Sequence, residues 1–503
     1  MKKYLIVLIL VVVGIVLLIR EIIPEHKKNN FIMVAQGLKP KSLDPHLYNE
    51  FSTLAITEHV FNTLVTLNDQ GNITPELAEN WEYISEKEIL FNLKKNVKFH
   101  NGKEMTEKDV VFSLQRMLKK PGSQTIVSDI ESVKEAGKYR VLVKLKNPSA
   151  PLLYNLTMPL AAILNEEYSL ESEEKSSLSP IGTGPFKIKK WDNGENIVLE
   201  KFHDYYKGSP KIDGIIFKVI TENSSRLAAL ETGDIDIAYA ISPIDFDTII
   251  ENPKLNLLHK LSTTTEFISL NVMKEGLKNK NLRKAIHHSI NKEGILEAVF
   301  LGRGKIAKSP INPSIFGSYQ ELEGYEYNPS KAKEILKEEN LENLNLKIWT
   351  SENILRVQIA QIIQSDLKDV GIKSTIEIVD LGTFLQKTSS GAHDILLTGW
   401  VLGASDSDAV MSALFHTSSI GSGGNRSFYS NIELDSELEL ARHTNDSEKR
   451  KNHYKKAQEI VADDNPVIPL IYKIDGIGVN KKIKNFQYNK STMRNYYEVM
   501  EKE

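Results

Sequence analysis

Short apolar runs alternate with amphipathic stretches over most of the chain, which is the pattern of an α/β or α+β protein. Runs rich in β-branched and aromatic residues predict strands at residues 31–34, 89–93, 140–145, 197–201, 215–220, 267–270, 346–349, 374–379 and 395–400. Apolar residues at helical spacing predict helices at residues 108–117, 225–231, 280–290, 329–338, 354–370 and 448–463. Thr106 ahead of Asp109 and the Asn328-Pro329 pair are start signals for two of these helices. Pro466 and Pro469 predict an edge or irregular path for their segment.

The first thirty residues form a separate unit. Lys2 and Lys3 precede an unbroken apolar run at residues 4–19. As a helix this run is about 24 Å long, at the short end for crossing a bilayer. A basic start followed by an apolar run is also the pattern of a secretory signal, although small residues spaced as in a cleavage site do not follow it. We expect export, with residues 1–30 serving as a signal peptide or as an N-terminal membrane anchor.

Composition narrows the function classes. A chain of 503 residues is too long for one hydrophobic core, so several domains are expected. Lys and Arg number 63 against 66 Asp and Glu, so there is no overall basic field for nucleic acid. Cysteine is absent from the sequence, which excludes disulfides, Cys-ligated metal centres, a cysteine nucleophile and a lipidated N-terminal cysteine.

Evidence for catalytic motifs is weak, since Ser289 and Lys292 fit Ser-x-x-Lys only as chance allows and without the partner motifs. There is no P-loop, no His-Glu-x-x-His and no Gly-x-Ser-x-Gly, and Lys187 stands where a dinucleotide fingerprint after Gly182 needs its third glycine. We expect that the protein is not an enzyme, with no catalytic residues, no cofactor and no metal site. Arginine is scarce relative to lysine, and it is the usual bidentate partner of carboxylates. Arg303, Arg356 and Arg426, the last in a glycine-rich loop, are therefore candidates for ligand contact.

Several segments, in order from about residue 38 to 475, resemble those of the extracellular solute-binding proteins of family 5, which serve peptide, nickel and related ABC importers. The most specific is Leu77-Ala-Glu-Asn-Trp81, followed by the extended run at residues 91–103. The others lie at residues 41–46, 105–116, 182–187, 205–208, 233–236, 269–271, 282–286, 328–333, 367–373, 399–400, 425–431 and 466–470.

The resemblance implies an α/β, two-lobed, periplasmic-binding-protein-like fold (type II, Venus-flytrap) with an extra subdomain inserted in lobe I. We expect lobe I at residues 31–261, including the inserted subdomain at 49–179, lobe II at 262–481, and a C-terminal return to lobe I at 482–503. Solute would bind in the cleft between the lobes and be trapped by hinge closure.

The resemblance also implies where a ligand lies. In peptide-binding relatives an acidic residue in the loop after a Gly-Trp pair contacts the peptide's α-amino group; after Gly399-Trp400 that place is held by Gly403. Dipeptide-type relatives use an arginine just before the helix that begins here near residue 354, where Arg356 is only a near substitute. Both departures favour longer peptides bound through their backbone by strand addition.

The expected ligand-binding set combines these positions. Trp400 would form an apolar wall, Asp406 or Asp408 a cation anchor beside Gly403, and Arg426 an anion anchor. Phe51 would face them from lobe I.

The function implied is that of an extracytoplasmic solute-binding component that takes peptides to an ABC permease with its ATPase subunits. We expect a monomer, exported to the periplasm or the outer face of the cytoplasmic membrane and tethered by residues 4–19 if they are retained. Two alternatives stay open. One is a nickel-chelate, haem or opine-like solute, for which His416 lies near the equivalent loop of nickel-type relatives. The other is a membrane-tethered solute receptor.

Overall fold

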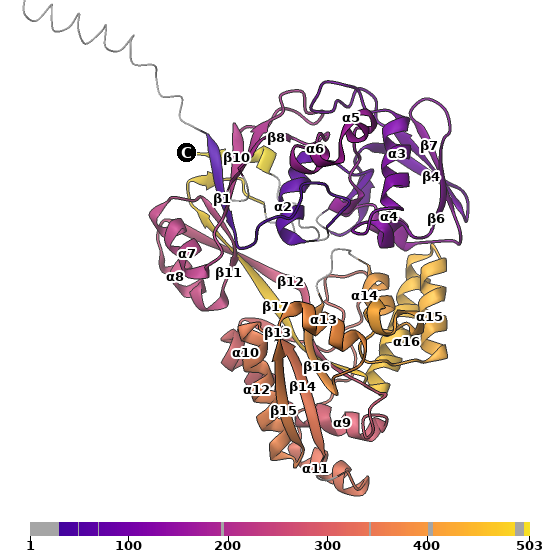
Figure 1. The fold of residues 1–503 in the computed structure, drawn as a ribbon, viewed down its shortest axis with the longest axis vertical. Coiled ribbons are helices and arrows are strands. Elements are labelled where there is room, and N and C mark those ends of the chain that lie inside the picture. Colours follow the sequence, from indigo (N-terminus) through magenta and orange to yellow (C-terminus); the bar gives the residue numbers. More distant parts are fainter. Residues whose placement is uncertain are drawn as a thin grey trace, which may run out of the picture.

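The structure is a computed structural model, and it describes residues 30–48, 50–68, 70–192, 196–341, 344–400, 406–487 and 497–503. Two bodies are joined by a pair of long strands, β12 (Leu255–Leu270) and β17 (Val467–Asn480). Figure 1 shows these strands passing from the upper body, lobe I, into the lower body, lobe II. The apolar run at residues 4–19 lies outside the described residues. None of the described helices is long and apolar enough to span a membrane.

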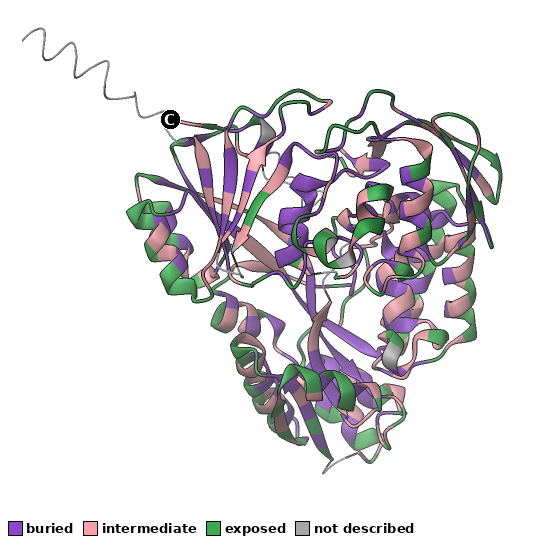
Figure 2. Cartoon of the chain, turned by 45° about the horizontal axis from the view of Figure 1, so that its top comes forward, coloured by how far each residue is buried: buried purple, intermediate pink, exposed green. Residues whose placement is uncertain are grey.

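One sheet continues through both lobes. In the described part of the chain it has 11 strands in the order β15-β14-β16-β12-β17-β11-β1-β10-β9-β8, with β13 beside β17. Its lobe II strands are β13 (Gly304–Ile306), β14 (Asn345–Ser351), β15 (Lys373–Val379) and β16 (Ile395–Trp400). Its lobe I strands are β1 (Phe31–Gln36), β8 (Phe186–Asp192), β9 (Asn196–Lys201), β10 (Gly214–Val219) and β11 (Ile237–Ile241). Helices cover the sheet, so strands β1, β11 and β17 in its middle are largely buried and apolar, whereas the edge strand β15 has no buried residue. Figure 2 shows both buried (purple) and partly buried (pink) segments along the strands.

The two crossing strands change register between the lobes. Leu261 pairs with Ile474 and Thr265 pairs with Tyr472, so three residues of β12 oppose one of β17. The predicted boundary after residue 261 falls at this irregularity. An irregular ladder is weaker than a regular one, which suits a hinge. Beyond it, Gly476 and Val479 of β17 already pair with β11 of lobe I.

Lobe I contains a second antiparallel sheet with its own core. Its strands are β4 (Ala78–Ser85), β5 (Glu88–Leu93), β6 (Ile130–Glu135) and β7 (Arg140–Leu145), in the order β4-β5-β7-β6. They pack on α3 (Glu107–Met117), where Thr106 N donates to the Asp109 carboxylate at 2.9 Å as the start signal predicts. The short pairs β2 (Val65–Leu67) with β3 (Ile73–Pro75) and β18 (Ile483–Lys484) with β19 (Glu501–Lys502) complete the strands. The boundaries of an inserted subdomain stay a prediction, which this separate core supports.

Helices cover both lobes. Those of lobe I are α2 (Phe51–Val60), α4 (Pro151–Asn155), α5 (Glu166–Glu171), α6 (Glu173–Leu178), α7 (Asn223–Thr232) and α8 (Phe246–Glu251). Those of lobe II are α9 (Lys280–Ser289), α10 (Lys292–Phe300), α11 (Pro329–Glu338), α12 (Ile354–Asp369), α13 (Leu381–Ser389), α14 (Ser407–Phe415), α15 (Ile432–His443) and α16 (Ser447–Asp464). Short 3-10 turns lie at Gln124–Val127, Pro159–Ala161, Pro243–Asp245, Thr417–Ser419, Gly421–Gly423 and Tyr497–Val499. The last residues return to lobe I, because Tyr497 and Met500 pack with β1, β10 and β11.

Candidate functional site

A cavity of about 160 Å³ opens where β16 ends in lobe II. It lies between β16, α13, α14 and the glycine-rich turn at residues 421–424, and apolar side chains form most of its wall. Trp400 and Arg426, two residues of the expected set, both line it. Parallel and mixed α/β sheets place ligands at the carboxyl ends of their strands, so the position is typical of a binding pocket.

Trp400 forms one wall of this cavity and packs on Gly424. A Cβ atom at Gly424 would lie 3.3 Å from the Trp400 ring, and the residue has φ +124°, a region that favours glycine. The glycine-rich turn therefore brings its backbone close to the indole and, two residues on, carries Arg426 to the cavity.

Arg426 is held by its backbone, while its side chain has no partner in the part of the chain that the structure describes. The buried His393 ring lies with Nε2 2.8 Å from Arg426 O, and Val272 N donates to Ser427 O at 2.9 Å. Its Nη1 atom is buried without a hydrogen-bond acceptor among the described residues. Burial lowers the pKa of the Arg426 guanidinium, and no carboxylate offsets that effect.

Asp406 forms an ion pair and hydrogen bonds with other residues of lobe II. Only 1% of it is exposed, and its carboxylate pairs with Arg450 Nη2 at 2.8 Å and accepts from Tyr454 OH at 3.1 Å. It also caps α14 by accepting from Asp408 N at 2.9 Å. Its charge is therefore paired with Arg450 in the structure, and its expected role as a cation anchor for a ligand stays a prediction.

Asp408 is also paired within lobe II, and its expected role as a cation anchor likewise stays a prediction. It accepts from Arg442 Nε at 3.1 Å and from the Ser412 hydroxyl at 3.1 Å. Burial raises the pKa of Asp408, although Arg442 opposes that shift. Gly403, the third member of this loop in the expected set, lies outside the described residues.

A buried charge cluster beside the cavity was not predicted from the sequence. Glu266 of β12 pairs with Arg356 of α12 at 2.9 Å and with Lys473 of β17 at 3.6 Å. Burial alone would raise the pKa of Glu266, but the two cations hold it below its usual value. A Cβ at Gly399 would lie 2.6 Å from Arg356 and 2.9 Å from Glu266, so the glycine before Trp400 makes room for this pair. The sequence signal for this cluster is Glu266 itself, which is the one charged residue in the strand segment at residues 262–270.

Phe51 stands on the lobe I side. It lies on α2, is 41% exposed, and meets Tyr239 of β11 edge to face at 5.6 Å between ring centroids. One turn further along α2, Leu54 shares a small hydrophobic cluster with Ala409 of α14 in lobe II. The two lobes therefore approach each other between α2 and the start of α14. Of the expected residues that the structure describes, Trp400 and Arg426 share one cavity.

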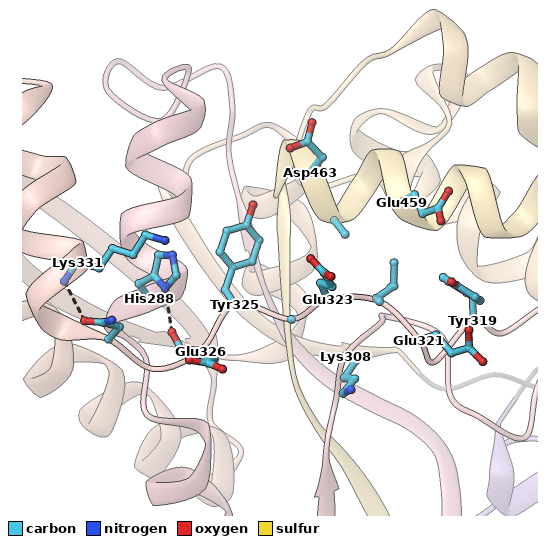
Figure 3. Close-up of a pocket in the computed structure, with 14 residues that line it drawn as sticks. His288, Lys308, Tyr319, Glu321, Glu323, Tyr325, Glu326, Lys331, Glu459 and Asp463 are labelled. Atoms are coloured by element: carbon cyan, nitrogen blue, oxygen red, sulfur yellow. Dashed lines mark hydrogen bonds between the residues drawn. The ribbon is translucent and has the colours of Figure 1, made fainter.

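Other hollows lie away from this cavity. Figure 3 shows a wide surface pocket of about 1010 Å³ in lobe II, lined by the loop at residues 319–328 and by Glu459 and Asp463 of α16. His288 there bonds Glu326 O at 2.8 Å, and Asp463 is paired with Lys280 and Lys284. It shares no lining residue with the cavity at Trp400.

His416, the candidate for a nickel-type ligand, bonds Ser418 Oγ at 2.7 Å and lies 3.4 Å from Glu439. Among the described residues no group of three or more His, Asp and Glu side chains is placed to hold a metal ion.

Comparisons with known proteins agree with this architecture. The model of the "Bacterial extracellular solute-binding proteins, family 5 Middle" matches residues 72–422. The chain is 28% identical to the dipeptide-binding protein of Escherichia coli, over 94% of this chain and 95% of that protein. It superposes on the periplasmic binding protein DppA of Helicobacter pylori, solved with the peptide STSA, with TM-score 0.81, 28% identity and coverage of 94% and 98%. It also resembles NikZ of Campylobacter jejuni, solved with Ni(L-His), with TM-score 0.79, 25% identity and coverage of 94% and 97%.

The fold and the position of the cavity define a two-lobed solute-binding protein. The chain belongs to the bacterial extracellular solute-binding proteins of family 5.

Proposed function

We propose that this protein is the extracytoplasmic solute-binding component of an ABC importer, which captures peptides between its lobes and delivers them to permease subunits driven by ATPase subunits. The observation that carries this proposal is the pairing of a two-strand hinge with a cavity at the end of β16 that presents an aromatic wall and an unpaired guanidinium. Binding of dipeptides and of the peptide STSA by the relatives supports peptides as the solute class.

The test is to identify what the protein retains. The chain is purified without denaturation and then unfolded, and the released compounds are identified by mass spectrometry. We expect peptides, and we expect calorimetry to show binding of synthetic di- to tetrapeptide pools. A retained nickel complex, with no heat from any peptide pool, would assign the protein to the nickel-type branch and contradict the peptide proposal.

We further propose that residues 4–19 tether the protein to the outer face of the membrane as a monomer. Small residues spaced as in a cleavage site do not follow this apolar run, and cysteine is absent from the sequence; both observations support a peptide anchor over a cleaved leader or a lipid anchor. Membrane fractions of the producing cell should then contain the intact chain, by its mass. A shorter, soluble product that lacks the leader would show a cleaved signal peptide instead.

A further inference from the structure

Arg426 differs from the other arginines that are withdrawn from water. Among the described residues, the remaining half-buried or buried arginines all have an acceptor for the guanidinium: Arg116 has Asp44, Arg226 the Ile220 carbonyl, Arg283 the Asp464 carbonyl, Arg303 Asp247, Arg356 Glu266, Arg442 Asp408 and Arg450 Asp406. An unpaired charge withdrawn from water destabilises the fold. Such a group is therefore expected to meet its partner in a ligand.

The cavity around Arg426 limits what that partner is. Its volume of about 160 Å³ admits a side chain, not a whole peptide. Phe384 and Leu385 of α13 and Trp400 of β16 give it apolar walls, and none of the described residues that line it is Asp or Glu. A guest that satisfies both features has a short apolar stem and an anionic end.

We propose that this cavity selects a carboxylate on a short aliphatic stem, so that the protein prefers solutes with an acidic side chain or a free terminal carboxylate at this position. The preference for peptides of this kind rests on the proposed function; the carboxylate pocket itself does not. The Arg426 guanidinium donates two N–H groups to the carboxylate, and the stem displaces water from the aromatic and aliphatic wall.

The pocket is prepared for this guest before it binds. His393 bonds Arg426 O, Val272 N donates to Ser427 O, and the Trp400 ring packs on Gly424, so the backbone that carries Arg426 needs little rearrangement on binding. The Arg426 guanidinium is already partly desolvated in the folded protein, so binding of an anion does not require that desolvation again. The interaction with the anion is therefore stronger than it would be in water.

Small probes test the pocket independently of peptide binding. Pentanoate and pentanamide, which share a stem and differ in charge, are titrated into the full chain by ligand-observed NMR. We expect pentanoate to bind at least about tenfold more tightly, because a charge-assisted bond replaces a neutral one. Arg426→Met should abolish that difference, while Arg140→Met, which removes an exposed arginine of β7, should leave it intact. Equal affinity of the two probes, or a preference that survives Arg426→Met, overturns the proposal.

Peptides then separate the two sources of the carboxylate. Ala-Glu-Ala and Ala-Gln-Ala, each with a free or an amidated C-terminus, are compared by calorimetry. Loss of affinity on Glu→Gln assigns the pocket to a side chain, and loss on amidation assigns it to the terminus. Failure of all four peptides, with the pentanoate preference intact, overturns the peptide proposal and leaves the carboxylate pocket standing.

The melting temperature distinguishes an arginine that binds a ligand from one that supports the fold. Removing an unpaired, half-buried charge should leave the melting temperature of Arg426→Met equal to or above that of the parent chain. A clear fall in melting temperature would mean that Arg426 supports the fold, which also overturns the proposal.

Discussion

His46, His287 and His393 are among the buried histidines of the described residues, and each is held as a neutral ring by a hydrogen bond to the protein interior. His46 Nε2 lies 2.9 Å from Ala162 O, His393 Nε2 2.8 Å from Arg426 O, and His287 Nδ1 2.9 Å from Asn465 Oδ1. Burial lowers the pKa of His46 and of His393 to about 4, and it lowers that of His287 well below its usual value. Protonation would place a charge where no solvent reaches it.

These shifts predict a loss of stability in mild acid. In the unfolded chain each ring takes up a proton near pH 6.5, and in the folded chain only near pH 4 or below. The unfolded state therefore binds more protons between these values, so the free energy of unfolding falls as the pH falls from about 6.5 to 4. Each histidine contributes at most about 3 kcal/mol to this fall. Urea denaturation at pH 7, 6, 5 and 4.5 measures it.

A substitution checks the source of the slope. His46→Asn should be less stable than the parent chain at pH 7, yet lose less stability on acidification, because one titrating ring is gone. The exposed His203 offers a matched His203→Asn control with an unchanged slope. An identical pH dependence in all three chains would remove the buried histidines as its cause.

At single residues, sequence reasoning separated polar from apolar positions but not paired charges from unpaired ones. Asp406 and Arg426 both lie in polar, glycine- or serine-containing stretches, yet Asp406 meets Arg450, 44 positions away, and Arg426 meets no carboxylate among the described residues. Tertiary structure, and not the neighbouring sequence, determines which charged partner Asp406 or Arg426 meets. The local sequence pattern does not reveal this partner, so the pairing of Asp406 with Arg450 could not be predicted beforehand.

At the scale of elements, local signals were sufficient where an element is bounded by a cap or a turn. The predicted helix at 329–338 begins and ends as α11 does, and the predicted strands at 140–145 and 395–400 match β7 and β16. Each has a sharp change of periodicity at its ends. The strand at 267–270 was predicted too short, because the first part of β12 carries polar residues such as Asn256 and His259 where it crosses between lobes.

Pro469 follows the expectation for a proline in a strand. The prolines at 466 and 469 predict an edge or irregular path, and Pro469 lies inside β17. Among the described strands Pro469 pairs with β12, whereas β17 meets β13 at Ile471–Lys473 and β11 at Gly476–Val479. The ladder also bulges here, because Phe267 pairs with Pro469 and the preceding Glu266 with Ile471. The expectation of an irregular path is confirmed.

At the scale of the whole molecule, the lobes touch at a distance from the hinge. Tyr154 of α4 in lobe I stacks on Phe316 of lobe II at 5.6 Å between centroids, and Ala150 N donates to Arg442 O at 3.0 Å. Phe316 is itself fixed, since the Arg450 guanidinium covers its ring at 4.8 Å and Ser407 N donates to its carbonyl at 3.0 Å. The Asp406–Arg450 pair therefore helps to hold the Phe316 ring against which Tyr154 of lobe I packs.

Because Phe316 joins the two lobes, we expect its substitution to change the affinity for a ligand that it does not touch. A stacked pair contributes about 1 kcal/mol beyond burial, so Phe316→Ala should weaken binding of a retained peptide by roughly five- to tenfold by making the closed form less stable. Small-angle scattering of the ligand-free chain should show a larger radius of gyration for this variant. Tyr327→Ala, an exposed aromatic elsewhere in lobe II, is the control.

A double-mutant cycle decides whether the stack itself is responsible. If Tyr154 and Phe316 act through each other, the effects of Tyr154→Ala and Phe316→Ala on affinity should be less than additive, with a coupling of about 1 kcal/mol. Additive effects would mean that each ring only supports its own lobe. Unchanged affinity and radius in Phe316→Ala would show that the hinge strands alone set the open–closed equilibrium. In the expected case, Asp406→Asn should weaken peptide binding through the same loss of closure, because it removes the charge that pairs with Arg450 beside Phe316.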